Sequence, residues 1–294
     1  MGQKVALVLS SGGARGLAHI GVIQGLLANG YEITSISGSS MGAVVGAFYA
    51  AGKLEVYHEW ALELDRYDIF KLLDFSFSTQ GFLRGEKVFK ELEKVIDDIK
   101  IEDMPISFRA MATDIINKKE VIFEKGSMYD AIKASVAIPT VIRPVPFEDT
   151  NLVDGAVINP IPISCVKRHE GDILVVSNVN AMIPYTPPKQ TQAEMEKAES
   201  YQKKIQNFVE KWAKMIPGNN EPKKKLGYFD LMTRSIELMQ DRLTSLILEK
   251  YNPEIRIDIS REVCTTFEFY KAEQVIAEGR RSLEESLLKI SKYS

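Results

Sequence analysis

A serine lies at the centre of a pentapeptide with the pattern G-x-S-x-G, at residues 38–42. The pentapeptide follows an apolar run that predicts a strand at residues 33–37, and it precedes a run of small residues that predicts a helix at 43–51. A turn of this kind lifts the central serine clear of a sheet, and its glycines leave room for neighbouring backbone. The pattern therefore indicates that Ser40 is a nucleophile, and an ordinary strand-to-helix turn is the alternative interpretation.

A second glycine-rich turn, at residues 12–16, joins a predicted strand at 4–9 to a predicted helix at 17–29. Backbone N–H groups at a helix N-terminus bind anions, so this turn could hold a phosphate or an oxyanion. A dinucleotide fingerprint needs a further glycine, where the chain has Ser11, and an acidic residue about 20 positions on. The turn therefore fits an oxyanion hole for a reaction at Ser40 better than a nucleotide site.

A serine nucleophile needs a proton acceptor, and the chain contains three histidines. His19 lies on the first predicted helix, where packing is the favoured role, whereas His58 and His169 lie among charged residues typical of a solvated surface. Asp154 ends a predicted strand in a turn that only small residues follow, and such strand ends are where α/β sheets handle ligands. The candidate base is therefore a carboxylate, with a turn-forming aspartate as the alternative.

These three motifs, in this order, resemble the patatin-like phospholipase family. The resemblance covers the glycine-rich turn, the pentapeptide at Ser40 and the sequence Asp154-Gly155-Ala156. Residues 81–85, 112–114 and 134–139 are similar to bacterial members of the family. The similarity spans roughly residues 4–180 and resumes near 228–280.

The resemblance implies an acyl hydrolase with a Ser-Asp dyad, in which Ser40 accepts the acyl group and Asp154 takes its proton and later activates water. It implies a lipid or lysophospholipid ester as substrate, with no cofactor and no metal. The implied oxyanion hole is formed by backbone N–H groups of Gly12, Gly13 and Ala14, with Arg15 adding positive charge, and the supporting motif residues are Gly16, Gly38, Gly42 and Gly155. Ser11 replaces the first loop glycine of the family, and a positive φ there would strain the turn.

The predicted strands and helices that must position these residues indicate an α/β fold. Further strands are expected at residues 106–115, 120–124, 151–154, 172–178 and 253–259, and further helices at 54–100 (broken near 78–81), 128–135, 228–250 and 269–291. Alternating strands and helices are typical of a parallel sheet. We therefore expect one domain over residues 1–294, with the three-layer fold that the family resemblance implies: a largely parallel central sheet flanked by helices, with a helical insertion.

Composition excludes several classes of function. The 294 residues carry a net charge of −3, which argues against nucleic-acid binding. With two cysteines, Cys165 and Cys264, and three histidines, the chain cannot build a cysteine-rich or multi-histidine metal centre. No apolar run reaches the roughly 18 residues that a membrane span needs. We expect free thiols in a reducing compartment, and hence a cytoplasmic location.

A basic segment at residues 185–225 lies outside the resemblance and predicts a helical insertion ending at about 226. Residues 189–225 contain nine lysines and five glutamates, and Phe208 and Trp212 lie on one helical stripe. Such a helix could be a lid that docks on anionic lipid, at the inner membrane surface, or an insertion packed on the domain. Two other functions remain open at this point: an acyltransferase that uses the same dyad, and a non-catalytic regulator at a membrane surface.

Overall fold

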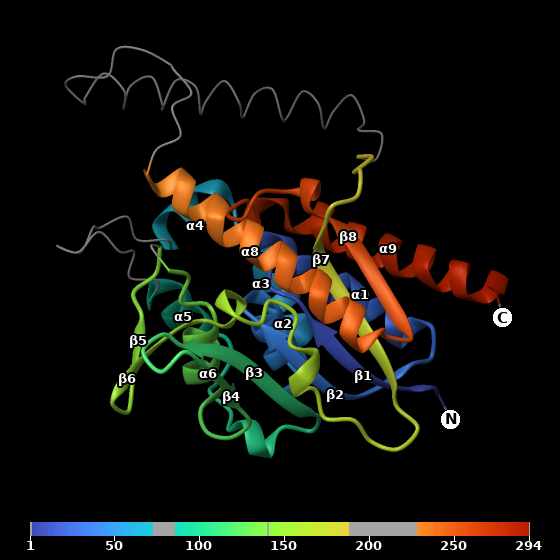
Figure 1. Cartoon of the computed structure of the whole chain (residues 1–294), viewed down its shortest axis with the longest axis horizontal. Helices are drawn as coiled ribbons and strands as arrows, with labels where there is room; N and C mark the ends of the chain where they lie inside the picture. The colour runs from blue at the N-terminus through green and yellow to red at the C-terminus, as the bar shows by residue number, and fades with distance from the viewer. Residues whose placement is uncertain (1, 73–85, 140, 188–227, 294) are drawn as a thin grey trace, which may run out of the picture.

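A computed structural model of the chain describes residues 2–72, 86–139, 141–187 and 228–293 (Figure 1). Its centre is an eight-stranded sheet in the order β5-β6-β3-β2-β1-β7-β8, with β4 paired to β3 off this path. The strands are β1 (Lys4–Leu9), β2 (Glu32–Ser39), β3 (Ser107–Asp114), β4 (Lys119–Phe123), β5 (Val145–Phe147), β6 (Thr150–Asp154), β7 (Ile173–Ala181) and β8 (Ile255–Ser260).

Helices flank this sheet, as expected from the alternating pattern. The α-helices are α1 (Ala18–Ala28), α2 (Met41–Ala50), α3 (Leu54–Glu63), α4 (Arg66–Leu72), α5 (Glu86–Glu93), α6 (Met128–Ser135), α8 (Tyr228–Tyr251) and α9 (Ala272–Tyr293). The short 3-10 helices are η1 (Gly13–Leu17), η2 (Ile101–Asp103), η3 (Gly155–Val157), η4 (Ile163–Cys165), η5 (Arg261–Val263) and η6 (Phe269–Lys271).

Both faces of the sheet are buried at its central strand β1. Side chains alternate along β1, so Leu7 enters the larger core cluster with residues of α1, α2 and α9, while Val8 enters a second cluster on the other face. Leu248, near the C-terminal end of α8, belongs to that second cluster. Burial on both faces explains why β1 reads as a continuous apolar run in the sequence.

The sheet is parallel through β3, β2, β1, β7 and β8. Beyond β3 the strands β4, β6 and β5 are joined in antiparallel pairs. The expected largely parallel sheet is confirmed for its centre. The paired strands expected at residues 106–115 and 120–124 are β3 and β4, whereas the antiparallel pairing of β6 and β5 was not predicted. The short strand β5 was also missed, because its three residues include Pro146 and carry no alternating pattern.

The expectation of helix over residues 54–100 is wrong at its C-terminal end. Helix α5 ends at Glu93, and the chain then turns toward Lys100, which forms an isolated bridge with Ser127. Asp98 in this turn accepts a hydrogen bond from the Tyr129 N–H. The segment therefore contacts the first turn of α6 and does not continue as a helix. The break expected near 78–81 and the family-like stretch 81–85 lie outside the described residues.

The basic segment also lies outside the described residues, apart from its first three positions, 185–187. The boundaries of the predicted insertion and the stripe with Phe208 and Trp212 therefore remain predictions. Among the helices that the structure describes, none combines the length and the apolar character needed to cross a bilayer.

Helices α1 and α9 touch backbone to backbone, which fixes the helix that follows the glycine-rich turn. A Cβ added at Gly279 would lie 2.0 Å from the carbonyl oxygen of Ala18, at the first residue of α1. Contact this close needs a residue without a side chain. The last helix of the chain therefore sets the position of the first.

We expect Gly279→Ala to lower the free energy of unfolding by about 1–3 kcal/mol, because the added methyl group forces α9 away from α1. Urea unfolding followed by circular dichroism measures the change. Lys289→Ala, on the exposed side of the same helix, is the matched control and should leave the midpoint unchanged. Equal midpoints for the two variants would contradict the proposed close contact.

Candidate active site

Ser40 lies on a turn whose backbone is held in a rare conformation. Strand β2 ends at Ser39 and α2 begins at Met41, and between them Ser40 has φ 55° and ψ −126°. A Cβ at Gly38 would lie 2.3 Å from the backbone of Gly42, so the turn closes only with glycine there. Positive φ at a non-glycine residue is typical of functional sites, where the surrounding structure maintains the strain.

Asp154 reaches Ser40 across strand β3. In the sheet register, Ser39 of β2 pairs with Met111 of β3, and the next residue of β3, Ala112, pairs with Asp154 of β6. The Ser40 hydroxyl donates a hydrogen bond of 2.6 Å to Oδ2 of Asp154. The structure therefore brings together the two residues that the sequence proposed as a dyad, although β6 runs antiparallel to β3.

The Asp154 carboxylate is buried without a cationic partner among the described residues. Burial raises the pKa of Asp154 to about 7, while hydrogen bonds from Ser40 and from the Ala156 N–H act in the opposite direction. Oδ1 accepts the Ala156 bond at 2.8 Å, which leaves Oδ2 for Ser40. A carboxyl group that titrates near neutrality is suited to exchange protons with a serine.

Ser135 holds the backbone of the turn and was not assigned a role from the sequence. Its hydroxyl accepts a hydrogen bond of 2.9 Å from the Ser40 N–H and donates one of 2.6 Å to the carbonyl oxygen of Met111. Ser135 is the last residue of α6, in the family-like stretch 134–139. The family-like stretch was the only feature of the sequence that pointed to a role for Ser135, because no neighbouring residue indicates a hydrogen bond to Ser40.

The glycine-rich turn lies beside Ser40. Of its three expected oxyanion donors, the Ala14 N–H is not available. The Ala14 N–H donates to the carbonyl oxygen of Thr266 at 2.9 Å, so it does not point toward a reacting group. The N–H groups of Gly12 and Gly13 have no hydrogen-bond partner in the part of the chain that the structure describes. The candidate oxyanion donors are therefore two, Gly12 and Gly13.

Ser11 does not strain this turn. It lies outside the set of described residues with positive φ, and the positive φ of 55° falls on Gly13 instead. The other motif glycines lie at close approaches: a Cβ at Gly16 would meet the side chain of Met41, and one at Gly155 would meet the carbonyl of Met111.

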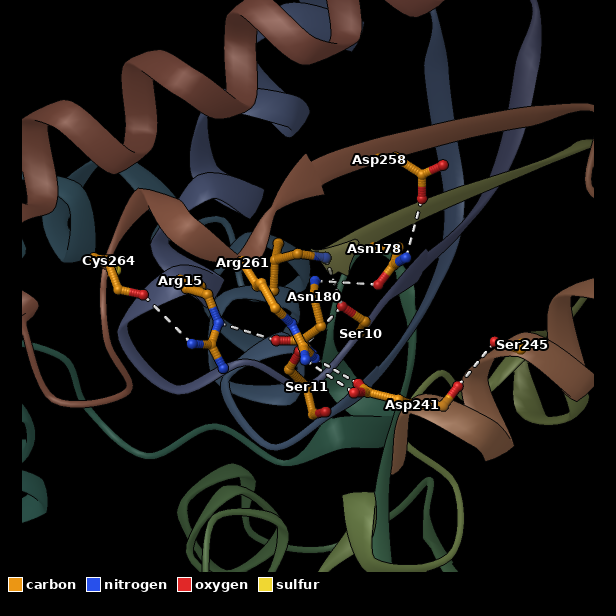
Figure 2. A network of polar contacts seen from close by, with 11 residues as sticks. Ser10, Ser11, Arg15, Asn178, Asn180, Asp241, Ser245, Asp258, Arg261 and Cys264 are labelled. Atoms are coloured by element: carbon orange, nitrogen blue, oxygen red, sulfur yellow. Dashed lines mark hydrogen bonds and ion pairs between the residues drawn. The ribbon is translucent and has the colours of Figure 1, made fainter. Parts of the chain in front are cut away.

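The Arg15 side chain extends from this turn toward strand β7 (Figure 2). Its Nε donates to Oδ1 of Asn180 at 3.0 Å, and a terminal nitrogen donates to the carbonyl oxygen of Cys264 at 3.4 Å. Burial lowers the pKa of the Arg15 guanidinium. Figure 2 also shows Arg261 paired with Asp241 of α8, with one bond of 2.9 Å from its guanidinium.

The histidines are placed away from the dyad. His19 is fully buried, with its ring nitrogens bonded to Ser177 Oγ and the Ser10 carbonyl oxygen at 2.9 Å each, and burial lowers its pKa to about 4. His58 is half-buried beside Glu55, and His169 is exposed. Among the described residues, no group of three or more histidine, cysteine or acidic side chains is arranged to hold a metal ion.

Two pockets meet at Ser40. The lining of the apolar pocket is mainly aliphatic and aromatic: Leu17, Met41, Val44, Tyr57, Trp60, Phe89, Leu92, Ile138, Phe267 and Phe269. The polar pocket has a lining that includes Gly12, Arg15, Asp154, Asn180, Glu237, Asp241 and Arg261. Gly13 and Ser40 line both pockets, so a bound molecule could extend one part into each.

We expect Ser135→Ala to lower the free energy of unfolding by about 1–3 kcal/mol, because it removes the hydrogen-bond partner of the buried Ser40 N–H. Ser39→Ala is a matched control, since the Ser39 hydroxyl is buried and already lacks a partner. Denaturant unfolding of the two variants measures the difference. A loss of stability in Ser39→Ala as large as that in Ser135→Ala would contradict the assigned role.

Comparison with known proteins gives this site a context. A family model described as patatin-like phospholipase matches residues 7–165. An uncharacterized NTE family protein of Mycobacterium tuberculosis is 33% identical, over 97% of this chain and 91% of that protein. Lysophospholipase nte1 of Aspergillus fumigatus is 29% identical, over 63% of this chain and 12% of that protein. The crystal structure of VipD from Legionella pneumophila aligns with a TM-score of 0.43 at 16% identity, over 97% of this chain and 67% of that one. The chain belongs to the patatin-like phospholipase family.

Proposed function

We propose that the protein hydrolyses the acyl ester of a phospholipid or lysophospholipid through an acyl intermediate on Ser40. The observation that carries this proposal is the 2.6 Å hydrogen bond from Ser40 to Asp154 where the apolar and polar pockets meet. Membership in the patatin-like phospholipase family supports lipid hydrolysis in general. The fungal relatives named lysophospholipases support a lysophospholipid as one substrate.

The first chemical step is attack of Ser40 Oγ on the ester carbonyl carbon, while its proton passes to Oδ2 of Asp154. Negative charge then develops on the carbonyl oxygen, where the N–H groups of Gly12 and Gly13 can stabilise it. The C–O bond to the leaving alcohol breaks, and the alcohol takes the proton from Asp154. This step leaves the acyl group on Ser40.

The second step regenerates the enzyme. Asp154, again a carboxylate, accepts a proton from water as the water oxygen attacks the acyl carbon. The bond to Ser40 Oγ breaks, the serine recovers its proton from Asp154, and a fatty acid leaves. One carboxyl group with a pKa near neutrality can perform both transfers without a histidine.

The two pockets support a substrate with an acyl chain and a polar head. The described residues that line the apolar pocket include no charged side chain, which suits a hydrocarbon chain. The polar pocket carries both arginine and acidic side chains, which suits a charged head group. An ester carbonyl at Ser40 lies between these two parts in a phospholipid or lysophospholipid.

We expect a fluorophosphonate probe to label the protein covalently, and Ser40→Ala to abolish the labelling. Asp154→Asn should label about 10²- to 10⁴-fold more slowly, because the serine loses its proton acceptor. Labelling is measured by intact-protein mass spectrometry over time. Fatty-acid release from a lysophospholipid, measured on the same variants, should decrease in parallel.

Ser39→Ala provides the control for this experiment, since it removes a neighbouring buried hydroxyl that has no partner. It should label at the rate of the parent protein. Labelling of Ser40→Ala at the parent rate would show that the nucleophile is a different residue.

We expect the rate of ester hydrolysis to rise with pH through an apparent pKa near 7. Asp154 has its pKa raised to about 7 by burial, and only its ionised form can accept the serine proton, so the rate falls below that pH. The measurement is kcat/KM for a soluble ester over a pH series. His58→Gln and His169→Gln should retain the same acidic limb, and its loss in either variant would assign the titration to that histidine.

A further inference from the structure

Helix α8 has one face on the polar pocket. Six of its residues line that pocket: Thr233, Ile236, Glu237, Gln240, Asp241 and Thr244. Their spacing of three and four residues places them on one side of the helix. The bidentate pair between Asp241 and Arg261 joins this side to the body of the protein (Figure 2).

The opposite side of α8 carries large apolar side chains in contact with solvent. Leu238 is 71% exposed, Met239 57%, Leu231 54% and Leu246 45%. At 3.6 residues per turn these four positions fall within about 100° of one another, on the side away from the pocket-lining residues. Isolated exposed apolar residues are ordinary on protein surfaces, whereas four large ones on the same side of one helix, here interrupted by Ser235 and Arg242, indicate an interaction surface.

The charged side chains near the middle of α8 also differ between its two sides. Glu237 and Asp241 lie on the pocket side, whereas Arg234 and Arg242 lie beside the apolar stripe and are exposed. Neither of these guanidinium groups has an ion-pair partner among the described residues. The outward face of α8, defined here as Leu231, Arg234, Leu238, Met239, Arg242 and Leu246, is therefore apolar and carries two cationic side chains. Exposed Glu249 adds one carboxylate on the same side, about one turn beyond Leu246.

We propose that the outward face of α8 docks on an anionic lipid bilayer. Leucine and methionine side chains would enter the boundary between head groups and acyl chains, and the two arginines would meet lipid phosphates. A helix with its surrounding side chains is about 10 Å across, so a docked α8 would hold the polar pocket close to the lipid surface. The docking does not depend on the proposed chemistry at Ser40.

The experiment uses the full chain carrying Ser40→Ala, so that lipid is not consumed during the measurement. Binding is measured by co-sedimentation with vesicles of phosphatidylcholine alone and of an equal mixture with phosphatidylglycerol. We expect binding to the anionic vesicles that weakens at high salt, and at least about tenfold weaker binding after Leu238→Asp with Met239→Asp. Arg234→Gln with Arg242→Gln should remove much of the salt dependence.

Leu288→Asp is the matched control, because Leu288 on α9 is 61% exposed and lies on another helix. It should bind vesicles as the parent does. Thermal unfolding midpoints establish that each variant is folded.

A second readout attaches a polarity-sensitive dye at Leu238→Cys or Leu288→Cys. Both natural cysteines are buried. We expect the emission to shift to the blue on anionic vesicles at position 238 alone.

Three outcomes would overturn the proposal. Unchanged binding in the Leu238→Asp, Met239→Asp variant would assign docking to another surface, including residues 188–227. Absence of binding to both vesicles, with a parent dimer that the double substitution converts to monomer, would assign the stripe to a second copy of the chain. Absence of binding without a change in oligomeric state would mean that the stripe does not contact a bilayer.

Discussion

The hydrogen bond between Ser40 and Asp154 places the strictest demand on this structure. A carboxylate without a cationic partner is buried beside a serine, which costs free energy that the remainder of the fold must supply. The same burial raises the pKa of Asp154 toward neutrality. Burial of this carboxylate is therefore destabilising, and in the proposed mechanism the same burial brings its pKa into the range that proton transfer needs.

Several distant segments share the task of holding this pair together. Strand β3 lies between the strands that carry the two residues, and its register fixes their separation. Ser135 at the end of α6 holds the N–H of Ser40, which keeps the residue in its positive-φ conformation. Two pockets of opposite character then meet at the hydroxyl group. The site is thus a property of the sheet edge as a whole and not of one loop.

Local sequence patterns were sufficient to predict those parts of the site that are formed by a few consecutive residues. The turn at Ser40, the glycine-rich turn and the strand ending at Asp154 were each predicted from a few neighbouring residues, and the structure contains all three. The antiparallel direction of β6 was not predicted, because pairing between β3 and β6 depends on contacts 41 residues apart, as in the bond from Thr113 to Asp154. Ser135 was missed for a similar reason, since its bond to Ser40 spans 95 residues. The engagement of Ala14 by Thr266 also depends on a distant part of the chain.

The hydrogen bond from Ala14 to Thr266 bears on the order in which the parts of the site form during synthesis. A ribosome releases the chain from its N-terminus, so the glycine-rich turn and Ser40 emerge well before Thr266, which follows Ala14 by 252 residues. Until then the turn lacks the carbonyl group that orients it, and α1 lacks the helix against which it packs. In a nascent chain the setting of Ser40 is therefore completed only after the segment that carries Thr266 has emerged.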